Sequence, residues 1–376
     1  MERGKSGNLR IAIVGCGQIA DAHLQEIAKI DGVEAVAVCD REPDLAYQAA
    51  ARFNIPYRFE DLERMLDEVR PDVVHITTPP HSHAPLAAAC MRRGAHVYVE
   101  KPFAVDAAET RQVLELATAH NRLACVGHDH VFDPVWIEAL ERIRSGHIGT
   151  PAHIDSQQGY DPGGPFGRLI QTDHHHWIHR LPGGIFQNVI SHAVSKVTPF
   201  LLDDHPETVA TAFGATAEFP LPTELRVALR GTSVTAHITL LSRGKPAQRV
   251  VRIYGTRAGH EVDFESGIIR HIRSAQLPGA FGRIETPMRQ ALEGAKHTAR
   301  AVTRFFRSDL HYFAGMRNLV TAFYAAVHTG GTPPIPYNEI QRVANIMDAI
   351  FQQTPCSSPF FKTDATMSQS ARDTTT

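Results

Sequence analysis

The sequence predicts an α/β protein of two domains, an N-terminal one built on a parallel sheet and a C-terminal α+β one with an open, mainly antiparallel sheet. Three observations support this. The chain has 376 residues, and a chain of this length usually folds around more than one hydrophobic core. Short apolar runs alternate with helical patterns up to about residue 130, as in strands joined by crossover helices. Beyond that point, strand-like runs follow one another directly.

The first domain is expected to cover residues 1–130. Its predicted strands are Arg10–Val14, Glu34–Cys39, Asp72–Thr77, His96–Val99 and Arg122–Val126. The segments between them repeat apolar residues at helical spacing, among them Asp44–Phe53, Leu86–Arg93 and Ala107–His120. Strands that alternate with helices in this way predict a doubly wound sheet.

The second domain is expected to cover residues 131–362. After a helix at Val135–Arg144, its predicted strands are Glu207–Thr216, Glu224–Leu229, Ser233–Leu241, Arg249–Tyr254 and His260–Phe264. Apolar periodicity predicts two helices over one face of this sheet, Ile185–Leu201 and His311–Val327, and a last helix at Asn338–Gln352. The polar tail, residues 363–376, is expected to be disordered.

Charge and composition exclude several classes of protein. Lys plus Arg number 38 and Asp plus Glu number 40, so no net field attracts nucleic acid or an anionic membrane. The basic stretch from Lys296 to Arg307 is interpreted as one face of an amphipathic helix. Five cysteines without a CxxC pair indicate reduced thiols. With no apolar stretch long enough to cross a bilayer, a cytoplasmic location is expected.

A glycine motif directly follows the first predicted strand. Residues 15–20 read GCGQIA, which matches G-x-G-x-x-G/A at the start of a helix. Gly15 permits the tight turn, Gly17 lets the backbone approach a pyrophosphate, and Ala20 allows close packing of helix and strand. With Gln18 and Ile19 at the helix N-terminus, the motif predicts dinucleotide binding on a Rossmann domain.

Asp40 ends the second predicted strand, twenty residues beyond Ala20. A carboxylate at this position accepts hydrogen bonds from the adenosine ribose, which favours NAD. The neighbouring Arg41 could instead bind a 2′-phosphate, so NADP remains an alternative.

Two further motifs follow strand ends. Thr77-Thr78-Pro79 leads to His83 after the third strand, and Glu100-Lys101-Pro102 follows the fourth. Ligands bind outside the carboxyl ends of strands in open parallel sheets. We therefore expect these residues at the cofactor, with Lys101 facing the nicotinamide.

These motifs together resemble the Gfo/Idh/MocA oxidoreductases, which act mainly on sugars, cyclitols and their derivatives. The resemblance rests on GCGQIA, TTPPHSH, HVYVEKPFA, VGHDHVFDP and IRSGHIGTP, and the segment VRIYGT fits the second domain. It implies that Lys101 is the catalytic lysine and that Glu100 and Pro102 shape the cofactor site. His130 follows as a candidate substrate residue, although the next residue is Val131 where many relatives carry Arg.

A second family signature, GG-x-x-x-D-x-G-x-H, reads GGIFQNVISH at residues 183–192. The resemblance gives His192 the role of general base. Asn188 stands where the family has Asp, and a helix would place both on one face. Loss of that carboxylate lowers the basicity expected of His192, which weakens the prediction of ordinary dehydrogenation. Asn188 can still bind a substrate hydroxyl.

The run from His174 to Trp177 invites a metal interpretation. Neighbouring residues of one loop cannot all face one ion, and no HExxH motif or paired Cys/His spacing is present, so we expect no metal. The glycine-rich approach, Gly159 to Gly167, predicts either a mobile substrate loop, with His176 or Trp177 on a sugar, or a plain surface loop.

The function expected first is hydride transfer between nicotinamide and a sugar-like polyol, including a nucleotide sugar. Two alternatives remain. One is a dinucleotide-binding regulator without turnover, since a galactose-pathway repressor shares the family's fold. The other is hydrolysis or epimerisation with NAD retained. An exposed apolar sheet face would favour a homodimer or homotetramer.

Overall fold

The computed structural model describes residues 8–161, 163–173, 175–214, 222–306 and 313–354. Two compact units result, residues 1–147 with 268–344, and residues 148–267 with 345–376. The predicted fold class is confirmed: a parallel sheet in the N-terminal part and a mixed, mainly antiparallel sheet in the C-terminal part. The boundary near residue 130 stays a prediction, and the predicted disordered tail lies outside the described residues.

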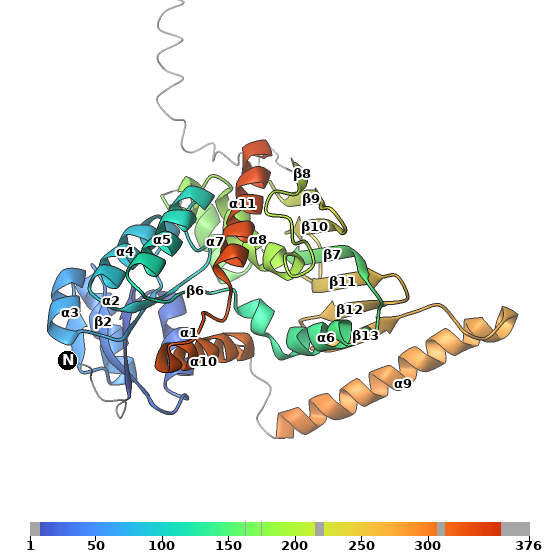
Figure 1. Ribbon diagram of the computed structural model, residues 1–376, viewed down its shortest axis with the longest axis horizontal. Helices are drawn as coiled ribbons and strands as arrows, with labels where there is room; N and C mark the ends of the chain where they lie inside the picture. Colours follow the sequence, from blue (N-terminus) through green and yellow to red (C-terminus); the bar gives the residue numbers. More distant parts are fainter. Residues whose placement is uncertain (1–7, 162, 174, 215–221, 307–312, 355–376) are drawn as a thin grey trace, which may run out of the picture. The chain divides into compact units, whose positions relative to one another are not determined.

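The first unit is built on a six-stranded sheet in the order β3-β2-β1-β4-β5-β6. Figure 1 labels two of its strands, β2 and β6. Every neighbouring pair is parallel. The strands are β1 (Leu9–Val14), β2 (Val33–Cys39), β3 (Tyr57–Phe59), β4 (Val73–Ile76), β5 (His96–Val99) and β6 (Ala124–Val126). The order reverses at β1, so the crevice at the ends of β1 and β4 is the place for a ligand.

Helices join these strands: α1 (Gln18–Ile27), α2 (Pro43–Phe53), α3 (Leu62–Val69), α4 (His83–Arg92) and α5 (Ala107–Ala119). All five predicted strands are present, although the structure adds β3 and α3. Two of the three β3 residues are exposed, so this edge strand has no apolar run that the sequence could reveal.

A seven-stranded sheet has the order β13-β12-β11-β7-β10-β9-β8. Its strands are β7 (Pro151–Gly159), β8 (Glu207–Phe213), β9 (Glu224–Arg230), β10 (Thr235–Leu241), β11 (Arg249–Gly255), β12 (Gly259–Asp263) and β13 (Ile268–Ile272). The sequence missed β7, although it is central. Its inward positions are Ile154, Ser156 and Gln158, and two polar residues there hide the alternation of a half-buried strand.

Helix α8 (Gly184–Val197) covers one face of this sheet, as predicted, and contacts β7 and β10. The same prediction for the helix near residues 311–327 was wrong. That helix, α10 (Ala314–Thr329), packs in the first unit, where Leu319 and Phe323 join the core of the parallel sheet. Buried Glu26 of α1 accepts a 2.7 Å hydrogen bond from Arg317, so a long-range ion pair also holds α10 there.

The remaining helical elements are η1 (Pro80–Ser82), η2 (Asp129–Phe132), α6 (Pro134–Arg144), α7 (Pro165–Thr172), η3 (Trp177–Arg180), α9 (Gly279–Phe306) and α11 (Tyr337–Gln353). The segment expected to be a loop after Gly159 therefore contains α7. Residues 296–306 of the basic stretch form the end of the amphipathic α9, and Arg307 lies outside the described residues. No helix in the described ranges has the length and apolarity to span a membrane.

Candidate active site

The glycine loop lies between β1 and α1. Gly15 has a φ of +93°, and a Cβ there would lie 2.9 Å from backbone atoms of Thr77 and Thr78, so only glycine fits. A Cβ on Gly17 would meet nothing within 4 Å. Open space therefore lies at the N-terminus of α1, where backbone N–H groups and the helix dipole favour a phosphate. The loop fits a dinucleotide pyrophosphate.

Asp40 stands directly after β2, beside this loop. One carboxylate oxygen accepts the Cys16 N–H at 2.6 Å and the other accepts the Glu42 N–H at 2.9 Å. These backbone bonds fix the carboxylate at the position where a ribose would be recognised. Arg41 is exposed.

The residues after β4 are tied to the glycine loop and to the segment after β5. The Thr77 hydroxyl donates to the Gly15 carbonyl at 2.6 Å. His83 places its two ring nitrogens 2.8 and 2.9 Å from the carbonyl oxygens of Thr78 and Pro102. The imidazole thus bridges the two loops that the sequence assigned to the cofactor.

A buried chain of hydrogen bonds begins at Glu100, the residue before Lys101, and was not expected from the sequence motifs. Glu100 Oε1 lies 2.9 Å from His23 Nε2, His23 Nδ1 lies 2.8 Å from His75 Nδ1, and His75 Nε2 lies 2.8 Å from the Tyr324 hydroxyl. Both histidines are fully buried. The Tyr98 ring stacks on His75 with centroids 4.7 Å apart. The chain holds Glu100 in one orientation, and its second oxygen accepts the Lys101 N–H at 3.1 Å.

This chain of hydrogen bonds also affects the charge of Glu100, next to Lys101. Burial by itself would raise the pKa of Glu100, but the hydrogen bond and charge of His23, with the charge of Lys101, lower that pKa below its usual value. Burial holds the pKa of His75 well below its usual value. At neutral pH a carboxylate therefore lies behind the lysine and a neutral imidazole lies deeper in the chain.

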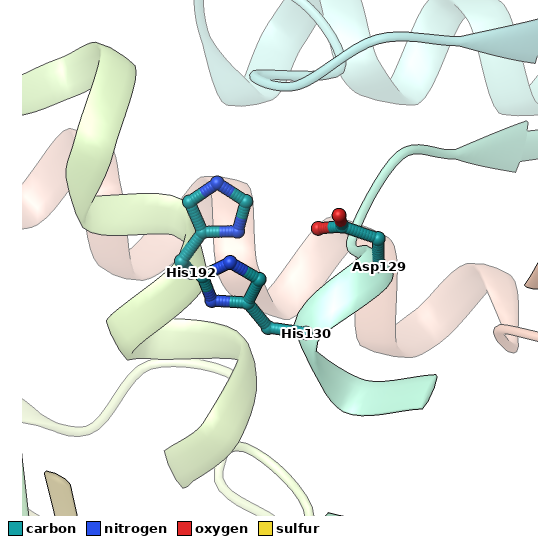
Figure 2. Close-up of side chains that lie close together, drawn as sticks. All are labelled: Asp129, His130 and His192. Carbon is teal, nitrogen blue, oxygen red and sulfur yellow. The ribbon is translucent and has the colours of Figure 1, made fainter. Parts of the chain in front are cut away.

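Asp129 and His130 begin η2, the turn that follows β6 (Figure 2). Burial, reinforced by the negative charge of Glu100, raises the pKa of Asp129 to about 6. Such a carboxyl can exchange a proton near neutral pH. The sequence motifs pointed to His130 but not to Asp129, because only the fold brings Glu100 near this turn.

Helix α8 carries the second set of candidate residues, with His192 on its middle turn (Figure 2). Two glycines stand at the start of the helix: Gly184 has a φ of +52°, which favours glycine, and a Cβ on Gly183 would collide with the Phe351 ring of α11. Asn188 and His192 lie one turn apart, as predicted. Lys196 follows after another turn, fully buried, with its ammonium 4.2 Å from the Phe264 ring centroid. The four-residue spacing could have revealed this lysine.

The predicted substrate residues His176 and Trp177 lie at the start of η3. Their rings are 5.1 Å apart, and Trp177 packs on a small apolar cluster of Ile170, Ile178 and Leu181 with Ile185 of α8. Part of the indole is therefore structural. The other part is accessible, and its use by a substrate stays a prediction.

The structure gathers the predicted cofactor residues on one unit, at the ends of β1, β2, β4 and β5. Lys101, Asp129 and His130 belong to the same unit, whereas His176, Asn188 and His192 belong to the other. That Lys101 and His192 meet at one substrate hydroxyl stays a prediction.

Comparison with known proteins supports an NAD-binding Rossmann fold in the N-terminal part of the chain. Residues 9–128 match the model of the Gfo/Idh/MocA family, described as "Oxidoreductase family, NAD-binding Rossmann fold". The resemblance carried by the sequence motifs is thereby confirmed, and the matched part contains the glycine loop, Asp40 and Lys101.

Two curated relatives are similar over the N-terminal part. The 4-carboxy-2-hydroxymuconate-6-semialdehyde dehydrogenase of Sphingobium sp. (strain NBRC 103272 / SYK-6) is 35% identical over 140 residues, which are 37% of this chain. The inositol 2-dehydrogenase of Salmonella paratyphi B (strain ATCC BAA-1250 / SPB7) is 33% identical over 149 residues, which are 39% of this chain. The chain spans 44% of the length of each relative.

Solved structures share the fold over nearly the whole chain. The crystal structure of the WlbA dehydrogenase from Bordetella pertussis in complex with NADH and UDP-GlcNAcA has a TM-score of 0.74 at 18% identity. The alignment covers 93% of this chain and 96% of that one. The likeness extends the shared fold through the second sheet.

Proposed function

Because residues 9–128 belong to the Gfo/Idh/MocA family of oxidoreductases with an NAD-binding Rossmann fold, we propose that the chain is an NAD(P)-dependent dehydrogenase. Its substrate is a sugar-like polyol, either free or as a nucleotide sugar. The observation that carries the proposal is the open space at Gly17, at the head of α1 and beside the fixed carboxylate of Asp40.

Lys101 and His192 are the residues that we assign to the reacting hydroxyl. The Lys101 ammonium donates a hydrogen bond to the hydroxyl oxygen and stabilises the negative charge that develops there. His192 accepts the hydroxyl proton on a ring nitrogen, and Asn188 binds a neighbouring hydroxyl. The nicotinamide, when bound, supplies the hydride acceptor. His130, His176 and Trp177 are assigned to the rest of the substrate.

Two observations support these roles for the site residues and this class of substrate. The lowered pKa of Glu100 keeps a carboxylate next to Lys101 in the chain, and its negative charge interacts with the positive charge of that lysine. The names of similar proteins, inositol 2-dehydrogenase and a dehydrogenase in complex with NADH and UDP-GlcNAcA, favour a hydroxylated ring as the substrate. A homodimer or homotetramer and a cytoplasmic location stay predictions.

The test is a thermal-shift screen of polyols, sugars and nucleotide sugars in the presence of NAD⁺ or NADP⁺, followed by turnover of each ligand that stabilises the protein. Production of reduced nicotinamide supports the proposal, provided that Lys101→Ala and His192→Ala each lower kcat by about a hundredfold or more with cofactor affinity retained. Unchanged turnover in either variant would refute its role. Cofactor that copurifies and is never released would instead favour the non-redox alternative.

A further inference from the structure

The open face of the second sheet, opposite α8, carries a cluster of His153, Asp155 and His237. His153 and Asp155 are two positions apart on β7, and their side chains therefore point to the same side of the sheet. His237 lies on β10 in register with Asp155. The three donor atoms, one from each side chain, all lie within 4.8 Å of one another. Strand pairing thus gathers three metal-ligating side chains on neighbouring strands of one unit.

We propose that this cluster binds one divalent transition-metal ion of the Zn²⁺ type. His153 Nε2 lies 3.0 Å and His237 Nδ1 lies 3.6 Å from the same Asp155 oxygen. Ligands about 2.0–2.2 Å from a tetrahedral zinc ion stand roughly 3.3 Å from each other. The two separations from the Asp155 oxygen bracket that value, and all three donor atoms lie within 4.8 Å of one another, so adjustment of the side chains can bring them around one ion.

The orientation of His153 is fixed from behind. Its Nδ1 lies 2.7 Å from the Thr235 hydroxyl, so Nε2 is turned toward Asp155. A histidine ligand typically uses its second nitrogen in this way, and the hydrogen bond sets the tautomer that binds the metal. The rings of His153 and His237 also make an edge contact with centroids 4.9 Å apart.

The charge beside the cluster does not oppose a cation. In register with Asp155 on the other neighbouring strand, Arg252 donates a 2.6 Å hydrogen bond to Glu261, so its positive charge is balanced by a carboxylate of its own. The Asp155 carboxylate is therefore left to interact with the imidazoles of His153 and His237.

Imidazole and carboxylate ligands select zinc and its transition-metal neighbours over calcium and magnesium, which prefer oxygen. Three protein ligands leave a fourth position for water or another ligand. Because the ligands come from two paired strands, the bound ion cross-links β7 and β10. We therefore assign it a stabilising role on the sheet face that α8 does not cover, independent of the proposed dehydrogenase activity.

The test compares zinc binding by untagged, chelator-treated protein and its variants. Equilibrium dialysis against buffered Zn²⁺, read by mass spectrometry of the metal, should show one zinc fewer per chain in Asp155→Asn and His237→Gln than in the unmodified protein. His205→Gln, which replaces another exposed histidine of the second unit, should bind as the unmodified protein does. Thr235→Val should weaken binding about 10- to 100-fold, as loss of an outer-shell partner does.

Three readouts keep the proposal falsifiable. Asp155→Cys supplies a stronger zinc ligand and should restore the ion that Asp155→Asn loses. Zinc should raise the melting temperature of the unmodified protein more than that of His237→Gln. Anomalous diffraction at the zinc edge should place an ion against His153, Asp155 and His237. Equal zinc content in all variants, or an anomalous peak only elsewhere, would overturn the proposal.

Discussion

Removal of a single hydroxyl, in Tyr324→Phe, tests the buried chain behind Lys101. Tyr324 is 3% exposed and His75 is fully buried, so water cannot replace the lost partner of His75 Nε2. Two proton arrangements satisfy the chain, with the tyrosine either donating to that nitrogen or accepting from it. In both, the variant leaves one buried polar atom unsatisfied, which costs about 1–3 kcal/mol of unfolding free energy.

The assay is urea unfolding followed by a probe of the first unit, with Tyr57→Phe as the matched control. Tyr57 is 53% exposed, so its hydroxyl should contribute less than about 0.5 kcal/mol. The double variant His75→Phe with Tyr324→Phe removes both partners and should lose less stability than the sum of the single variants. A Tyr324→Phe variant as stable as the control, or strictly additive losses, would refute the chain as a cooperative unit.

The remaining predictions concern the cofactor and the charged residues. Gly17→Val should leave folding intact, since a Cβ there meets nothing within 4 Å, yet lower NAD affinity by about a hundredfold or more in calorimetry; unchanged affinity would make the loop an ordinary turn. Asp40→Ser should shift preference toward NADP, and tighter NADP than NAD binding by the unmodified protein would contradict the assignment. Burial raises the pKa of Asp129 from 3.8 to about 6, so the folded state holds this proton more tightly than the unfolded state. The resulting stability is present below about pH 4 and lost as the pH rises through 6, and Asp129→Asn should therefore stabilise the protein by about 1–3 kcal/mol at pH 8 but not at pH 4; an equal effect at both values would exclude the raised pKa. Asn188→Asp should raise dehydrogenase turnover if the carboxylate supports His192, whereas a loss of turnover would mean that the amide itself recognises the substrate.

The Rossmann part was predictable from sequence because its signals are local. A buried parallel strand is a short apolar run, a crossover helix repeats at 3.6 residues, and the glycine motif occupies six consecutive positions. The positive φ of Gly15 and the open space at Gly17 agree with the roles that the motif assigned to each glycine. Helix α8, with Asn188 and His192 one turn apart, was likewise readable from spacing alone.

Other features depend on residues that the sequence separates widely. His75 lies 52 positions from His23, Glu100 lies 77 from His23, and Tyr324 lies 249 from His75. The motifs pointed to Glu100 alone, whereas His23, His75 and Tyr324 each resemble an ordinary polar residue of the core. The bond from Tyr324 to His75 exists only because α10 packs in the first unit. Amphipathic periodicity cannot specify that packing, since it reports a buried face but not the partner that buries it.

The sequence by itself therefore determined the fold class, the cofactor loop and the identity of the candidate catalytic residues, since backbone preferences and local burial periodicity are encoded over a few turns or strands. Tertiary structure decided which charges surround them. Burial and the charge of Glu100 raise the pKa of Asp129, and strand register brings His237 beside Asp155. Desolvation and Coulomb interactions act through space, so their effect on a side chain is set by neighbours that the order of residues along the chain does not reveal.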